Sequence, residues 1–89
     1  MGNSKSRLLI AYDLLKPNYT PDDYKKLYAE LDSIGAKRIQ DSVWAVRTDA
    51  DAFDVFDRLQ RYIYRTDRLL VIRVNGFRSR GAINKLSRI

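Results

Sequence analysis

Short apolar runs along the chain predict strands. Between them lie two longer stretches in which apolar residues recur every three or four positions, and this spacing predicts helices. The first run covers residues 7–14, with Arg7 at its front and a Lys-Pro-Asn turn signal behind it. A run of about four to eight apolar residues bounded in this way is typical of a strand buried on both faces. It contains one carboxylate, Asp13, close to its end.

Both predicted helices have a recognisable start. Residues 20–23, Thr-Pro-Asp-Asp, combine a capping hydroxyl, a proline suited to the first helical position and two acids that favour the positive end of the helix dipole. Gly35 predicts a left-handed cap at the other end. A second helix is predicted to begin within residues 48–51 and to run to about Tyr64. The apolar positions of the two helices are Tyr24, Leu27, Tyr28, Leu31 and Ile34, then Ala52, Phe56, Leu59 and Ile63, with Val55 and Tyr62 at the flanks.

Three further strands are predicted, at residues 37–40, 42–48 and 68–74, with a break at Asp41 between the first two. In the middle strand the alternation places Trp44 and Val46 on one face and Ala45 on the other. Trp44 is expected in the core or in a subunit contact, and base stacking is the alternative. The run at 68–74 is as apolar as the first and predicts a second buried strand.

The order strand, helix, strand, strand, helix, strand predicts a single ferredoxin-like α+β domain over residues 1–89, with a core at 7–75 and a basic tail at 76–89. This fold is a four-stranded antiparallel sheet with both helices on one face. The tail allows either an extra C-terminal strand or a short helix. Because the strands are apolar on both sides, a second copy of the chain is the simplest cover for the free face, and we expect a homodimer.

Composition narrows the chemistry. The sequence has no cysteine and no histidine, which excludes disulfides, thiolate metal sites and histidine as a general base, and leaves carboxylates and metal-bound water. A net charge of +6 favours a polyanionic partner, with nucleic acid, RNA or DNA, ahead of a membrane surface. No apolar run approaches the roughly twenty residues that span a bilayer, and residues 1–6 are too short and polar for a signal peptide, so we expect a cytoplasmic protein.

Asp13 is the candidate functional residue that the pattern itself offers. A carboxylate at the end of a central strand lies where side chains leave the packed sheet, and binding sites are often built there. The alternative is that Asp13 only opens the following turn, where aspartate is common.

Two motifs resemble the Cas2 proteins of CRISPR adaptation modules and their VapD-like and SinR-like relatives. The first is Tyr-Asp-Leu at residues 12–14, similar to the family's Tyr-Asp-Ile/Leu signature. The second is Arg-Ile-Gln-Asp-Ser-Val-Trp at 38–44, which looks like the family's Arg-Val-Gln-x-Ser-Val-Phe. The resemblance extends over roughly residues 7 to 75. Residues 16–19 lack the arginines that many Cas2 proteins carry there, and Trp44 replaces the usual Phe, which favours the SinR-like or VapD-like relatives.

The resemblance implies that Asp13 side chains from two subunits hold a divalent cation, Mg²⁺ or Mn²⁺, in a nuclease. Our hypothesis is a homodimeric, metal-dependent endonuclease acting on RNA or DNA, in which Asp13 is both metal ligand and catalytic residue and Tyr12 and Ser42 are supporting polar groups. The alternative is a non-catalytic dimer that binds nucleic acid or bridges protein partners. Either way, the expected phosphate contacts are Arg38, Arg78, Arg80, Lys85 and Arg88. The tail residues among them could equally be a solvated end.

Overall fold

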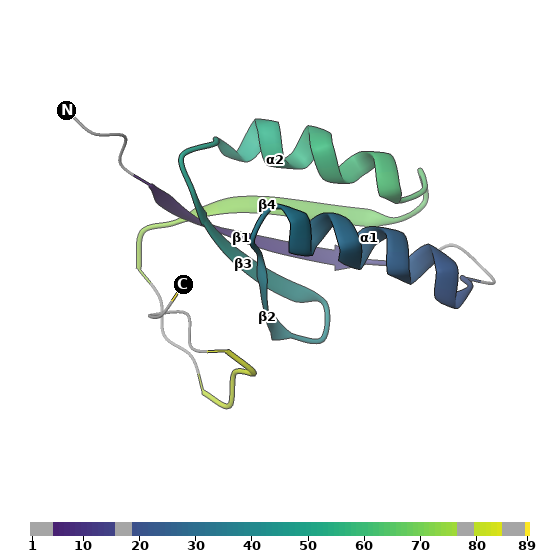
Figure 1. Cartoon of the computed structure of the whole chain (residues 1–89), viewed down its shortest axis with the longest axis horizontal. Helices are drawn as coiled ribbons and strands as arrows, with labels where there is room; N and C mark the ends of the chain where they lie inside the picture. Colours follow the sequence, from purple (N-terminus) through teal and green to yellow (C-terminus); the bar gives the residue numbers. More distant parts are fainter. Residues whose placement is uncertain (1–4, 16–18, 77–79, 85–88) are drawn as a thin grey trace.

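The computed structural model describes residues 5–15, 19–76, 80–84 and 89, and has the predicted order of elements (Figure 1). The strands and helices are β1 (Ser6–Asp13), α1 (Pro21–Ser33), β2 (Lys37–Gln40), β3 (Val43–Thr48), α2 (Ala52–Leu59), the short 3₁₀ helix η1 (Gln60–Tyr62) and β4 (Arg68–Val74). The break between β2 and β3 is a tight turn at Asp41 and Ser42, as predicted.

The four strands form one antiparallel sheet in the order β2-β3-β1-β4, which confirms the ferredoxin-like fold. β1 is central and pairs with β3 on one side and β4 on the other. Asp13 is therefore the last residue of a central strand, while β2 and β4 are the two edges.

The helix starts and stops follow the local chemistry. The Thr20 hydroxyl accepts from the Asp23 N–H and the Asp23 carboxylate accepts from the Thr20 N–H, which together make a capping box at the start of α1. Gly35, with φ of +84°, follows α1 in the left-handed conformation that glycine adopts without strain. Asp51 caps α2 by accepting from the Asp54 N–H.

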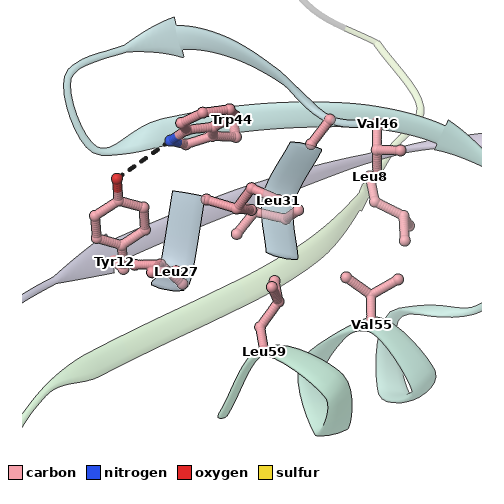
Figure 2. Packing of buried hydrophobic residues seen from close by; sticks show 10 residues of the cluster. Leu8, Tyr12, Leu27, Leu31, Trp44, Val46, Val55 and Leu59 are labelled. Carbon is pink, nitrogen blue, oxygen red and sulfur yellow. Dashed lines mark hydrogen bonds between the residues drawn. The ribbon is translucent and has the colours of Figure 1, made fainter. Parts of the chain in front are cut away.

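The main core lies between the sheet and the two helices (Figure 2). Leucines from α1 and residues from α2 pack on the inward side chains of β1 and β3, and Trp44 belongs to this cluster, as expected. The fully buried members are Leu8, Ile10, Leu27, Leu31, Val46 and Leu59. Because both helices contribute to one cluster, they cover the same face of the sheet.

The second helix is shorter than predicted. α2 ends at Leu59, and the chain passes through η1 to Ile63, which is extended with φ of −128° and ψ of 168°. The Tyr64 N–H donates to Asp67 Oδ2 at 2.8 Å instead of continuing a helical ladder. This local acceptor competes with the helix, as aspartate near a turn often does.

The predictions that β1 is buried on both faces and that β4 is a buried strand are wrong for this chain on its own. In β1 the inward residues are buried, but Leu9 and Ala11 on the outer face are only half-buried. β4 is an edge strand with no buried residue, and Leu70 and Ile72 are 53% and 41% exposed. The register pairs Leu9 with Ile72 and Ala11 with Leu70, so these four side chains form a continuous apolar patch, the β1–β4 outer patch.

On the β2–β3 side of the outer face, the described residues of the C-terminal segment pack against the sheet. Ala82 and Ile89 pack on a small cluster around Ile39 and Ala45. The Ile83 N–H donates to Ile39 O at 2.8 Å, and Asn84 Nδ2 donates to Arg38 O at 2.7 Å. Neither of the structures considered for the tail, a strand or a helix, is found at residues 80–84 or 89.

Candidate functional site

Asp13 is exposed at the end of the central strand, beside a basic residue of the edge strand. It pairs with Arg68 in the register of β1 and β4, and Arg68 Nη1 lies 3.6 Å from Asp13 Oδ2. The Asp13 side chain is 58% exposed and the Arg68 side chain is 75% exposed, so both can meet a solute. An exposed pair of this kind contributes little to stability, about 0–1 kcal/mol.

Asp13 opens into a shallow hollow of about 340 Å³, the Asp13 hollow. Ser42 and Arg68 line it together with apolar side chains of β3 and β4. The Tyr12 N–H donates to Ser42 O at 3.1 Å, which ties the β2–β3 turn to the end of β1. The structure therefore brings Asp13 and Ser42 to one hollow, and the supporting role of Ser42 stays a prediction.

The Tyr12 side chain points the other way, into the core (Figure 2). Trp44 Nε1 donates to Tyr12 Oη at 3.2 Å, and both residues are buried. Burial raises the pKa of Tyr12 to about 12, an effect that the hydrogen bond from Trp44 partly opposes. Tyr12 thus reaches the Asp13 hollow through its backbone, while its hydroxyl serves the core.

Asp67 organises the segments on either side of the site. Its carboxylate accepts from the Leu15 N–H at 2.7 Å, from the Tyr64 N–H at 2.8 Å and from the Tyr19 hydroxyl. Leu15 lies two residues after Asp13, and Asp67 directly precedes Arg68. Burial, followed by the hydrogen bond to Asp67, raises the pKa of Tyr19.

Arg38 does not line the Asp13 hollow. Its guanidinium carbon lies 4.9 Å from the centre of the Tyr28 ring and 5.2 Å from that of Trp44, which are cation–π distances. Its Nε is buried and has no hydrogen-bond acceptor within the described part of the chain. Arg38 pairs with Trp44 across β2 and β3, and this shared face directs it toward the aromatic side chains. Its role as a phosphate contact stays a prediction.

Of the predicted tail contacts, Arg80 is exposed and free to meet a phosphate. Arg78, Lys85 and Arg88 lie outside the described residues. Two residues of the site were missed at the sequence level, Arg68 and Asp67. Arg68 could have been found, because the antiparallel register of this fold sets the start of its last strand opposite the end of its first.

The described residues contain no cluster of three or more acidic, histidine or cysteine side chains that could hold a metal ion. Among the described residues that line the Asp13 hollow, Asp13 is the only acid, and Arg68 lies next to it. Mg²⁺ is bound in proteins by one or two carboxylates together with waters and substrate phosphate. Asp13 fits that pattern as one ligand of a largely hydrated cation, and does not fit an all-protein cage.

Comparison with known proteins shows the family of this chain and agrees with its fold. Residues 6–80 match the family model described as CRISPR associated protein Cas2. The chain belongs to the Cas2 family. It also resembles the crystal structure of a hypothetical protein from Thermus thermophilus, with 27% sequence identity and a TM-score of 0.61 over 82% of this chain and 85% of that one. Cas2 membership supports a nucleic-acid-associated function.

Two further observations on this Cas2 chain concern its charge and its helices. Its net charge of +6 suits a polyanionic partner. Among the described residues, no helix has the length and apolar character needed to cross a membrane.

Proposed function

We propose that this chain is a homodimeric Cas2 protein that binds RNA or DNA and hydrolyses its phosphodiester bonds with a divalent cation, Mg²⁺ or Mn²⁺. The cation would be held by Asp13 from each subunit and by the substrate phosphate. The observation that carries the proposal is the position of Asp13. It is an exposed carboxylate at the end of the central strand, next to an exposed arginine and within a shallow hollow.

Asp13, Arg68 and Ser42, which line the hollow, each have a defined role in this proposal. Asp13 binds the cation, and a divalent cation bound there supplies an activated water and neutralises charge on the phosphate. Arg68, which pairs with Asp13 in this structure, would contact the phosphate when Asp13 holds the cation, and its guanidinium would balance the developing negative charge. The Ser42 carbonyl holds the end of β1 in place through the Tyr12 N–H.

The β1–β4 outer patch supports the dimer. Leu70 and Ile72 are large apolar side chains on an exposed sheet face, beside Leu9 and Ala11. The described part of the C-terminal segment packs on the β2–β3 side of that face, while Leu70 and Ile72 are exposed. Because Asp13 lies on the same face at the end of β1, a two-fold axis near that end would bring the two Asp13 side chains together.

The test is cleavage of labelled single-stranded and double-stranded RNA and DNA with Mg²⁺, with Mn²⁺ and with EDTA. We expect metal-dependent cleavage that Asp13→Asn reduces by at least about 100-fold, because even the loss of a partner that only orients a metal ligand costs about 10- to 100-fold. Asp49→Asn is the matched control, because Asp49 is also exposed but lies at the opposite end of β3. Cleavage that survives Asp13→Asn would refute the assignment.

A second candidate is a Cas2 dimer that binds nucleic acid without cutting it or that bridges protein partners. One observation favours it. Arg68 already balances the charge of Asp13, so the carboxylate has a partner within the chain and needs no cation. This candidate predicts no cleavage under any metal condition, together with binding that weakens steeply with salt. The same assay therefore decides between the two.

A further inference from the structure

A second hollow lies on the other side of Arg68, between η1 and the start of β4. Its volume is about 490 Å³, within the range of about 300–1,000 Å³ common for small-ligand sites. Arg68 and Leu69 line both this hollow and the Asp13 hollow, so the two are adjacent. We call it the Tyr64 hollow.

The lining of the Tyr64 hollow combines aromatic and basic groups. Tyr64 is 46% exposed, and Phe56 is also exposed. Arg65 and Arg68 supply two exposed positive charges. Such a set offers an aromatic surface for a base and two donors for a phosphate.

The acid in the lining does not cancel this charge at the opening. The Asp67 carboxylate accepts from the backbone N–H groups of Leu15 and Tyr64, so it is directed toward the protein. The amide nitrogen of Gln60 donates to Asp57 at 3.3 Å. Arg65 and Arg68 are therefore the exposed charged groups of the lining, and Arg68 is shared with Asp13.

We propose that the Tyr64 hollow binds one unpaired nucleotide of a single-stranded nucleic acid. Its base would lie against Tyr64, and its phosphate would lie between Arg65 and Arg68. Because Arg68 also borders the Asp13 hollow, the next phosphate along the strand enters the proposed cleavage site. The inference deepens the proposed function by adding a base-binding site beside the Asp13 hollow, and its binding step does not depend on cleavage.

Single strands are favoured over duplexes for a physical reason. A base in a duplex is covered on both faces by its neighbours, so it must be unstacked before it can meet a protein ring. A single strand exposes its bases at little cost, and base–aromatic stacking then adds affinity without regard to sequence. A side-chain ring beside two arginines suits single-strand binding, and it would add little affinity for an intact duplex.

The first test measures binding in EDTA, so that cleavage plays no part. Fluorescence anisotropy follows labelled single-stranded RNA, single-stranded DNA and a duplex, each binding to wild type and to Tyr64→Leu. We expect Tyr64→Leu to weaken single-strand binding about 5- to 150-fold, the range for loss of one stacked base, and to leave duplex binding within about 2-fold. Tyr64→Phe keeps the ring and should retain single-strand affinity. Phe53→Leu removes an exposed ring outside the hollow and serves as the matched control.

A second variant keeps the test independent of any folding defect in Tyr64→Leu. Arg65→Gln should lower the slope of log affinity against log salt by about 0.7, the value for one phosphate contact on a single strand. Arg61→Gln is the control, because Arg61 lies on η1 outside the hollow. A slope that falls equally in both variants, or in neither, would overturn the phosphate contact.

The outcomes separate this inference from the proposed hydrolysis. Binding in EDTA that depends on Tyr64, without cleavage dependent on Asp13, would refute the hydrolase and leave the inference standing. Cleavage that depends on Asp13, with single-strand binding indifferent to Tyr64 and Arg65, would do the reverse. Equal loss of single-strand and duplex binding in Tyr64→Leu, or competition by poly-glutamate as effective as by an oligonucleotide, would also overturn it.

Discussion

Asp13 and Arg68 face each other where β1 ends and β4 begins, and the carboxylate and the guanidinium lie 3.6 Å apart. The charge of the acid is therefore balanced before a ligand arrives. A cation at Asp13 has to displace Arg68, while a phosphate attracts Arg68 away from Asp13. The pair links the two hollows, because Arg68 lines both.

This arrangement predicts opposite effects of Arg68→Gln on two ligands. Mn²⁺ should bind to the free protein up to about 5-fold more tightly, since an exposed ion pair of up to about 1 kcal/mol no longer competes. Single-stranded nucleic acid should bind more weakly, since a phosphate contact is lost. Mn²⁺ titration followed by electron paramagnetic resonance and anisotropy in EDTA measure the two effects. Weaker Mn²⁺ binding in Arg68→Gln would contradict this competition.

The Asp67 carboxylate supports a prediction about local order. In Asp67→Asn one acceptor oxygen is replaced by a donor, so at least one partner among Leu15 N–H, Tyr64 N–H and the Tyr19 hydroxyl loses its acceptor. We expect the free energy of unfolding to fall by about 1–3 kcal/mol and the amide of Leu15 or Tyr64 to exchange faster with solvent. Urea denaturation and hydrogen exchange measure this. Asp49→Asn is the control, and unchanged exchange at both amides would show that Asp67 does not order the segment.

Local signals in the sequence were enough for the elements that make the fold. Residues 20–23 predicted the start of α1, Gly35 its end, and the apolar run at 68–74 coincides with β4. These features depend on backbone chemistry within a few residues, which a sequence contains directly. The position of Asp13 at the end of a central strand followed from them.

Burial and long-range contacts were harder to predict from the sequence. β4 reads like β1 in sequence, yet one is an edge strand and the other is central, because strand order is a property of the whole sheet. Arg38 occupies a motif position but packs on two rings, since its register partner is Trp44. The contact between Leu15 and Asp67 joins segments distant in sequence, and no short-range pattern predicts it.

The β1–β4 outer patch predicts a charge-sensitive dimer. Leu70→Asp places a carboxylate in the middle of the patch, where burial in a dimer would leave the charge without a partner. We expect the dissociation constant to rise at least about 10-fold, measured by sedimentation velocity at several protein concentrations. Phe53→Asp is the control, because Phe53 is a more exposed apolar side chain on α2, away from the outer face. Dimers weakened equally by both substitutions, or a wild-type protein that stays monomeric at high micromolar concentration, would contradict the proposed interface.

The burial of Tyr12 predicts how stability depends on alkaline pH. Burial raises the pKa of Tyr12 to about 12 in the folded protein, against about 10 when unfolded, so the folded state retains a proton that the unfolded state loses. This contribution is complete below pH 10 and is lost as the pH rises from about 10 through about 12, which amounts to about 1 kcal/mol by pH 11. Tyr12→Phe should lower the free energy of unfolding at pH 8 by about 1–2 kcal/mol, because the buried Trp44 N–H loses its acceptor. Between pH 8 and pH 11, however, the free energy of unfolding of Tyr12→Phe should fall by about 1 kcal/mol less than that of wild type. Urea denaturation at the two pH values measures both effects, with Tyr64→Phe as a control at an exposed ring. An equal pH-dependent loss in wild type and Tyr12→Phe would mean that the Tyr12 hydroxyl does not couple ionisation to folding.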